Sequence, residues 1–214
     1  MRRTLVIDTA GPVVGVAAIV GDSCISAVEE RIVLGADGWL LPAMADALGM
    51  LGGLRTRDCI VLGVGPGAFT GVRVGLAAAL GLAEAVGCRI VPVSSLLLRA
   101  AANPGFSRLV VALDARKGKV YAAEFDTTGS LPLTLCEARD IPPETAFTGA
   151  GAAAGEGACV YRERLGALAL VERPDTCGVA AAGRFTQEEG LDPAAVQLAY
   201  LRGEDQVVTL ARPK

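Results

Sequence analysis

The sequence contains no histidine among its 214 residues. Histidine is the usual general base near neutral pH and the commonest metal ligand in proteins. A catalytic triad built on histidine and a zinc site ligated by histidine are therefore excluded. Any catalysis has to rest on carboxylates, lysine or cysteine, or be absent, and no metal site is predicted.

Aromatic residues and paired cysteines are also scarce. Aromatic residues make up 4% of the chain against 52% hydrophobic residues, so a close-packed interior of small aliphatic side chains is expected, which favours α/β layers. The six cysteines occur singly without a CxxC pair, and the N-terminal stretch MRRTLVIDTA reaches Asp8 before a signal-peptide core can form. We expect a reduced, cytoplasmic protein.

A basic stripe and a long apolar run are both missing. The net charge is −3, and basic residues occur in short groups such as Arg116-Lys117-Gly118-Lys119, so direct binding of nucleic acid is not expected. The longest uncharged apolar run, between Arg73 and Glu84, is shorter than the ~20 residues that span a membrane. No membrane association is predicted.

The first half of the chain alternates strand and helix signals. A hairpin and a third strand are followed by helices and strands in turn, which is typical of parallel crossover units beside an antiparallel edge. Pro42 is expected in the first turn of its helix. The predicted strands are 4–8, 13–20, 23–33, 59–64 and 89–93, and the predicted helices are 39–51, 70–86 and 95–102.

The second half repeats the beginning of the first. The stretch NPGF at 103–106 marks a boundary, so the expected subdomains are 1–105 and 106–214. A second hairpin, 108–115 with 119–126, resembles the first in its Asp-terminated strand and indicates a weak internal duplication. We predict a helix over 176–190 and an extended strap over 195–208.

The stretch GVGPGAFTG at 63–71 admits two interpretations. Gly63, Gly65 and Ala68 give the dinucleotide pattern GxGxxA between a strand and a helix. Pro66 lacks an N–H group that could donate a hydrogen bond to a pyrophosphate. The strand 89–93 does not end on an acid that could bind a ribose hydroxyl, so the dinucleotide interpretation is disfavoured. The alternative is a turn that lets strand and helix approach closely.

Helices 39–51 and 70–86 carry almost no charge. Gly71, Gly75 and Ala79 recur every four residues and form a smooth ridge that another backbone could approach. A helix that is apolar all round needs cover on every side. Either the two helices and the second half cover one another, or a partner protein does, and we favour the partner.

Asp8 and Asp114 each end an early strand of their half. Together they could hold a hydrated magnesium ion against phosphate. Alternatively each caps turn N–H groups, which is the interpretation we favour. Arg116, Lys117 and Lys119 are expected at a solvated hairpin tip. Cysteines 59 and 88 are expected in the core.

Several motifs together resemble one known family, the bacterial TsaB (YeaZ) family. They are LVIDTAGPVVGVAA, VLGVGPGAFTGVRVGLAAALGLA, PVSSLLLRAA, ALDARKGKVYAAEF and AYLR, which reach from end to end of the chain. The resemblance implies an α/β, actin/Hsp70-like fold (ASKHA, ribonuclease H-like) of mixed sheets with helices, in two related subdomains of which the second is reduced. It also implies the dimerisation subunit of the machinery that makes threonylcarbamoyladenosine in tRNA.

The same resemblance implies a non-catalytic subunit with several partners. These are a catalytic actin-like paralogue subunit, a small ATPase and, indirectly through the complex, tRNA, with a homodimer expected for the chain alone. No cofactor is expected on the isolated chain, whereas ATP and magnesium are expected at the assembled complex. The helices matching 39–51 and 70–87 are implied to pair with the catalytic subunit.

The implied site residues fall into two groups. The partner-binding group is Leu40, Met44, Leu48, Leu51, Gly71, Val72, Gly75, Ala79 and Leu82. The group for a vestigial phosphate or ATPase-contact loop is Asp8, Thr9, Gly67, Thr70, Arg73 and Asp114. The sequence departs from the family at Ala10 and Ala68, where serine is common, at Ala199, where proline is frequent, and within GADGW, where a histidine is frequent.

Two other hypotheses stay open from the sequence. One is an enzyme that uses nucleotide and magnesium through Asp8 and Asp114. The other is an inactivated peptidase-like domain without a role in tRNA modification.

Overall fold

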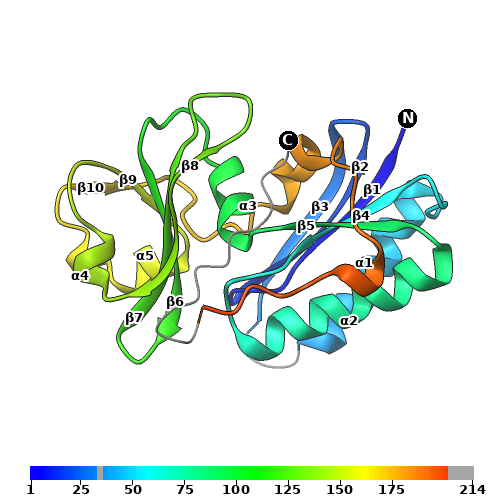
Figure 1. Ribbon diagram of the computed structural model, residues 1–214, viewed down its shortest axis with the longest axis horizontal. Coiled ribbons are helices and arrows are strands. Elements are labelled where there is room, and N and C mark those ends of the chain that lie inside the picture. Colours follow the sequence, from blue (N-terminus) through cyan, green and yellow to red (C-terminus); the bar gives the residue numbers. More distant parts are fainter. Residues whose placement is uncertain (33–35, 202–214) are drawn as a thin grey trace.

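The computed structural model describes residues 1–32 and 36–201, which form two sheets side by side (Figure 1). The first sheet has five strands in the order β3-β2-β1-β4-β5. Its first three strands pair antiparallel, and β1, β4 and β5 run parallel. The strands are β1 Arg3–Asp8, β2 Val13–Val20, β3 Ser23–Arg31, β4 Cys59–Gly63 and β5 Arg89–Val93.

The second sheet repeats the topology of the first. Its order is β10-β9-β6-β7-β8, with β8, β7 and β6 antiparallel and β6, β9 and β10 parallel. Asp8 in β1 and Asp114 in β6 occupy the same position in their sheets, so the predicted internal duplication is confirmed. The strands are β6 Leu109–Arg116, β7 Lys119–Asp126, β8 Leu133–Ile141, β9 Gly151–Ala154 and β10 Leu168–Leu170.

The helices of the second half are much shorter than their counterparts. The helix between the third and fourth strands has 16 residues in the first half and 4 in the second, and the next helix has 18 and 5. The second subdomain is therefore the reduced one. The helices are α1 Ala36–Leu51, α2 Phe69–Val86, α3 Ser95–Ala101, α4 Pro143–Ala146 and α5 Glu156–Val160, with 3₁₀ turns η1 Arg162–Arg164, η2 Val179–Phe185 and η3 Pro193–Ala195.

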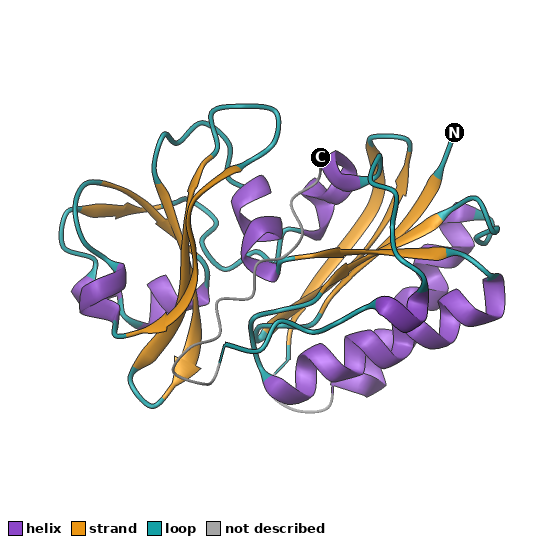
Figure 2. Ribbon diagram, viewed as in Figure 1, coloured by secondary structure: helices purple, strands orange, loops and turns teal. Residues whose placement is uncertain are grey.

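The elements stack in layers with α3 between the two sheets (Figure 2). Helices α1 and α2 cover one face of the first sheet, where Leu5, Ile7 and Ile60 join their core. Helix α3 and η2 cover its other face. Helix α3 also packs on the second sheet through Leu96 and Ala100. Both faces of the central strands β1 and β4 are buried, which explains their nearly continuous apolar character.

The C-terminal part of the described chain returns to the first sheet. Val179 and Phe185 pack into the core on the face of that sheet that α3 covers, and Leu191 pairs with Ile90 at its edge. The backbone N–H of Ala199 donates to the Val64 carbonyl at 2.9 Å. The strands of the first sheet precede the expected boundary and those of the second sheet follow it. The expectation that all of 106–214 belongs to the second subdomain is wrong for the segment from Val179 to Ala199, which packs on the first sheet.

Two helix predictions also need correction. Helix α1 begins at Ala36, so Pro42 lies inside the helix and not in its first turn. Only the 3₁₀ turn η2 forms within 176–190, where Gly178 adopts a positive φ of 84° and Gly183 lies against the backbone of Asp22.

Helix α2 is long and apolar enough to cross a membrane, judged by its length and composition alone. Its 18 residues have a mean hydropathy of 1.4. Its buried side, formed by Val72, Gly75, Ala79 and Ala83, packs on the first sheet, as in the core helix of an α/β layer. We therefore interpret α2 as a layer of this fold.

Candidate functional site

The small-residue ridge of α2 faces the interior of the protein. A Cβ atom at Gly71 would overlap the Thr9 carbonyl oxygen, and one at Gly75 would overlap Thr9 Oγ1. A Cβ atom at Gly67 would overlap the Ala10 carbonyl. The ridge therefore lets α2 approach the turn after β1, and the prediction that it faces a partner is wrong.

Most of the other predicted partner-binding residues are also turned inward. The predicted spacing of these residues along each helix is correct, but the face on which they lie packs against the chain's own sheet. The small residues allow the helices to approach that sheet closely. Buried members of the predicted set are Leu40, Met44, Leu51, Val72, Gly75 and Ala79, and half-buried members are Leu48, Gly71 and Leu82.

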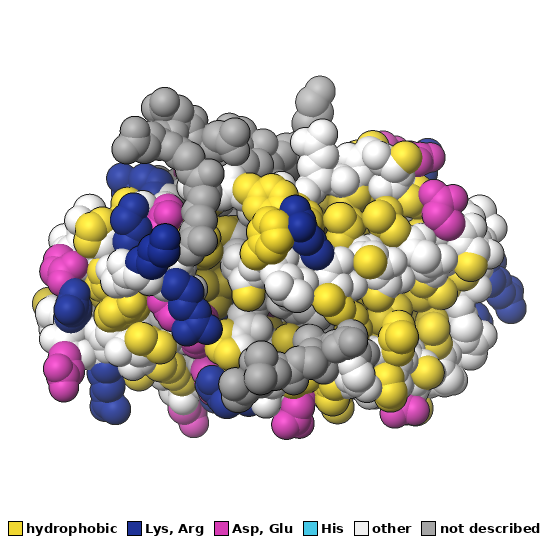
Figure 3. Space-filling view, turned by 90° about the horizontal axis from the view of Figure 1, so that it is seen from below, with side chains coloured by type: hydrophobic (Ala, Val, Ile, Leu, Met, Phe, Trp, Pro, Cys, Tyr) yellow, Lys and Arg dark blue, Asp and Glu magenta, His cyan; other side chains and the backbone are white. Residues whose placement is uncertain are grey.

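The opposite side of α1 and α2 is apolar and exposed, and we call it the outer helical face. Leu41, Met50 and Phe69 are 61%, 60% and 57% exposed. Figure 3 shows hydrophobic side chains spread over these helices, whereas charged side chains gather over the second subdomain and the rim. The face consists of Leu41, Pro42, Ala45, Asp46, Gly49, Met50, Phe69, Thr70, Arg73, Ala77, Gly81, Glu84 and Ala85.

A second row of small residues lies on this face. Ala77, Gly81 and Ala85 recur every four residues, and a Cβ atom at Gly81 would meet nothing within 4 Å. This row has the same spacing as the inner ridge, so it could have been recognised from the sequence. An exposed, nearly uncharged helix face that a second backbone can approach is typical of a protein interface.

An aromatic cluster ends the outer helical face at the start of α2. The Arg73 guanidinium lies 3.6 Å above the centre of the Phe69 ring. Its Nε donates to Tyr200 Oη at 3.0 Å, and the Phe69 and Tyr200 ring centres are 5.9 Å apart. Exposed aromatic and arginine side chains that are held rigid in this way are the usual anchors of protein interfaces.

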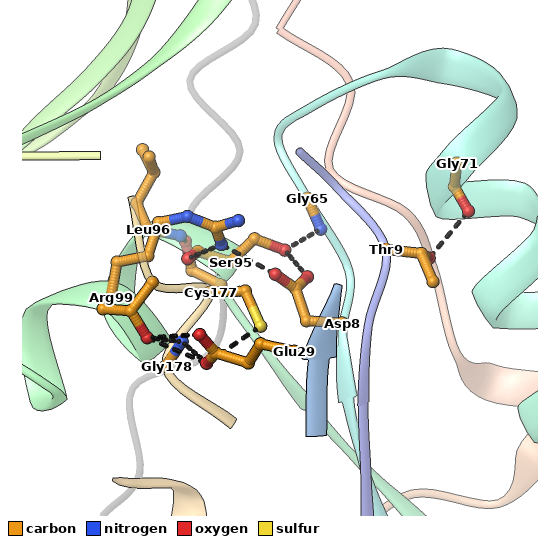
Figure 4. A network of polar contacts seen from close by, with 12 residues as sticks. Asp8, Thr9, Glu29, Gly65, Gly71, Ser95, Leu96, Arg99, Cys177 and Gly178 are labelled. Atoms are coloured by element: carbon orange, nitrogen blue, oxygen red, sulfur yellow. Dashed lines mark hydrogen bonds and ion pairs between the residues drawn. The ribbon is translucent and has the colours of Figure 1, made fainter. Parts of the chain in front are cut away.

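The carboxylate of Asp8 is enclosed inside the first subdomain (Figure 4). Arg99 Nη1 donates to Asp8 Oδ2 at 2.7 Å, and Ser95 Oγ donates to Asp8 Oδ1 at 2.6 Å. Burial is the largest influence on the pKa of Arg99 and lowers it, but the surrounding acidic groups, Asp8 first, together raise this pKa above its ordinary value. Arg99 therefore stays charged and neutralises Asp8.

This ion pair contradicts both interpretations of Asp8 from the sequence. Among the described residues no turn N–H donates to the Asp8 side chain, and its buried carboxylate is paired with Arg99 and Ser95 instead of with a magnesium ion. Gly63 makes the arrangement possible, because a Cβ atom there would overlap Asp8 Oδ1. The hypothesis of an enzyme that binds magnesium through Asp8 and Asp114 is therefore wrong at Asp8.

The glycine turn uses its own backbone donors internally. The Gly65 N–H donates to Ser95 Oγ at 3.1 Å, and the Ala68 N–H donates to the Ala10 carbonyl at 2.7 Å. Thr9 Oγ1 donates to the Gly71 carbonyl at 2.7 Å. These contacts confirm the close strand-to-helix turn. They also disfavour a dinucleotide site, because the N–H groups of Gly65 and Ala68 already donate within the chain and are not free to bind a pyrophosphate. Of the loop residues predicted from the resemblance, Thr70 and Arg73 are exposed.

Asp114, the counterpart of Asp8, caps a turn. Its Oδ1 accepts from the Arg116 N–H at 2.9 Å, and its Oδ2 lies 3.2 Å from Arg116 Nη1. The capping interpretation is confirmed here. Arg116, Lys117 and Lys119 are exposed at the hairpin tip, as expected.

Glu156, which the sequence analysis did not single out, lies buried beside Asp114. Its Oε1 accepts from the Asp114 N–H at 3.1 Å, and its Oε2 is buried without a hydrogen-bond partner among the described residues. Burial, opposed by Arg99, raises the pKa of Glu156 from 4.5 to about 7. The side chain is therefore partly protonated near neutral pH.

The buried cysteines are not activated as nucleophiles. Cys59, Cys88 and Cys177 are buried, which confirms the core placement expected for the first two. Burial raises the pKa of each thiol above its ordinary value. The thiolate is the reactive form, so burial disfavours covalent catalysis at these three sites.

Comparison with known proteins gives related sequences over the whole chain. An uncharacterized protein of Mycobacterium tuberculosis is 33% identical over 215 residues, covering 96% of this chain and 94% of the relative. The tRNA threonylcarbamoyladenosine biosynthesis protein TsaB of Escherichia coli is 36% identical over 127 residues, covering 58% of this chain and 54% of that protein. A family model described as "TsaD: tRNA N6-adenosine threonylcarbamoyltransferase" matches residues 38–139.

The duplicated mixed sheets define a two-subdomain α/β protein of the actin/Hsp70-like class, as predicted from the resemblance. The solved structure of YeaZ from Pseudomonas aeruginosa matches with a TM-score of 0.80 and 27% identity, over 94% of this chain and 100% of that one. The chain belongs to the TsaB (YeaZ) family.

Proposed function

We propose that this chain is a non-catalytic subunit in the biosynthesis of threonylcarbamoyladenosine in tRNA. In this proposal its outer helical face pairs with the catalytic actin-like paralogue subunit. Relatives from Escherichia coli, Haemophilus influenzae and Bacillus subtilis carry the name tRNA threonylcarbamoyladenosine biosynthesis protein TsaB, which supports the process. The finer role, that of a scaffold, rests on the outer helical face.

The observation that carries the proposal is the exposure of apolar surface on both helices. Leu41, Met50 and Phe69 each leave more than half of their area in water, and small residues lie between them. Removing such apolar area from water favours association with a partner. A helical partner that packs along Ala77, Gly81 and Ala85 would cover it.

Three features support a subunit without its own chemistry. The sequence has no histidine, Asp8 is neutralised by Arg99, and Cys59, Cys88 and Cys177 are buried. In the proposed assembly the catalytic subunit carries out the reaction.

The wider assembly follows from the same proposal. A small ATPase joins the assembled pair, with ATP and magnesium bound at the complex. Its proposed contact residues are Thr70 and Arg73, which are exposed near the beginning of α2. Transfer RNA is bound through the complex, in the cytoplasm. In isolation the chain forms a homodimer through the outer helical face, because that face is the same on both copies and can cover itself.

Gly81→Arg tests the interface directly. The substitution places a long charged side chain in the middle of the outer helical face, where a Cβ atom meets nothing within 4 Å, so the fold tolerates it. We expect the affinity for the catalytic subunit to fall by a factor of about thirty or more, as for loss of an interface hot spot. The measurement is calorimetric titration with the catalytic subunit.

Two variants serve as comparisons. Ala169→Arg changes an exposed alanine on β10 of the second subdomain, and we expect it to leave the affinity unchanged. Gly75→Leu, on the buried ridge, is expected to reduce the yield of folded protein because of the overlap with Thr9. Equal affinities for Gly81→Arg and Ala169→Arg would contradict the proposed interface.

A further inference from the structure

A cavity of about 510 Å³ lies between the two sheets on the side of their edge strands β5 and β8. Its apolar lining comes from both subdomains and from the returning C-terminal segment. This volume is within the usual range for small-molecule sites, about 300–1,000 Å³. The apolar side chains that form its walls include Val91, Val93, Leu97, Phe125, Phe185 and Leu191.

The charged groups around the cavity are mostly acidic. Among the described residues, Glu137 from β8 and Glu188 and Glu189 from the segment after η2 line it, against Arg89 as the one basic residue. Arg89 Nη1 already donates to the Gly190 carbonyl at 3.4 Å. Within residues 1–32 and 36–201, no ion pair joins any of the three glutamates to a cation.

The glutamates are more exposed than the most deeply buried walls of the cavity. Glu189 is exposed and Glu137 and Glu188 are half-buried, whereas Val91 and Phe125 are buried. A ligand that suits this arrangement has an apolar body for the walls and a positive charge at the opening. A carboxylate or phosphate ligand would meet three negative side chains and is disfavoured.

The walls also include two residues of the segment 199–201, whose Tyr200 belongs to the aromatic cluster with Phe69 and Arg73. Ala199 and Leu201 line the cavity. Tyr200, which lies between them in the chain, instead accepts a hydrogen bond from Arg73 Nε through its hydroxyl group. Side chains alternate in this way along an extended segment. The cavity and the aromatic cluster therefore lie on opposite sides of the same three residues.

We propose that this cavity is a binding site for an aliphatic amine. The ammonium group lies among Glu137, Glu188 and Glu189, and the hydrocarbon part lies against Val91 and Phe125. This site is separate from the outer helical face and does not rest on the proposed function.

Calorimetric titration of the full chain with three probes of equal length tests the proposal. The probes are n-octylammonium, octan-1-ol and octanoate at neutral pH. We expect n-octylammonium to bind at least about tenfold more tightly than octan-1-ol, and octanoate to give no saturable heat. Equal binding of the ammonium and the alcohol, or no binding of the ammonium, would overturn the assignment.

Two neighbouring substitutions on β8 locate the binding. Glu137→Lys reverses one charge at the opening, and we expect it to weaken n-octylammonium binding at least about tenfold. Ala138→Phe adds volume to the wall of the cavity and is expected to weaken the ammonium and the alcohol alike. Glu163→Lys, an exposed residue of η1, is the matched control. If Glu137→Lys and Glu163→Lys have the same effect, the amine does not bind in this cavity.

Discussion

Arg99→Met is expected to lower the free energy of unfolding by about 3–5 kcal/mol, because it leaves the Asp8 carboxylate buried with Ser95 as its one remaining donor among the described residues. The guanidinium of Arg99 is itself buried, 2.7 Å from Asp8 Oδ2. For a chain of this length such a loss lowers the melting temperature by roughly 10 °C or more. Urea denaturation followed by circular dichroism gives the free energy.

The double variant Asp8→Asn/Arg99→Met separates the charge from the packing. Removing both charges is expected to recover most of the stability, because no uncompensated ion is left in the core. A single variant that loses less than about 1 kcal/mol, or a double variant as unstable as Arg99→Met, would contradict the role assigned to this pair.

Glu156→Gln is expected to stabilise the protein at alkaline pH and to change little at acidic pH. The pKa of Glu156 is about 7 in the folded chain against 4.5 ordinarily, so the folded state holds its proton more tightly than the unfolded state. The stability contributed by this protonation is complete below pH 4.5 and is lost as the pH rises through 7. Above pH 7 the difference corresponds to about 3 kcal/mol.

The glutamine keeps an oxygen for the Asp114 N–H and carries no charge to bury. We expect an increase of about 2–3 kcal/mol in the free energy of unfolding near pH 8.5 and almost none near pH 4.5. Glu163→Gln, on an exposed side chain, is expected to change stability at neither pH. A gain of the same size at both pH values would show that burial of the charge is not the cause.

Much of the fold could be predicted from local sequence. Strands β1, β2 and β4 have long apolar runs, and the two Asp-terminated hairpins have the same pattern, so the duplication can be predicted from the sequence. Strand β9 was missed because its four residues, GAAA, have little strand preference and are short. It becomes recognisable as a strand only as the counterpart of β4.

The site was harder to predict because it depends on contacts between distant residues. Nothing local indicates that Arg99 would reach Asp8, 91 positions earlier in the chain. Likewise, the spacing of Gly71 and Gly75 shows that something approaches α2 closely, but not that the approaching group is Thr9 of the same chain. The period of a helix gives its faces, and only packing decides which face is buried.

The most direct test of the scaffold role is hydrogen–deuterium exchange on this chain, first diluted until it is monomeric and then in complex with the catalytic subunit. If the outer helical face is the interface, exchange of peptides from α1, from α2 and from the segment around Tyr200 slows on binding, while exchange of peptides from β8 and β10 stays the same. A complex that forms without any change in α1 and α2 would contradict the account.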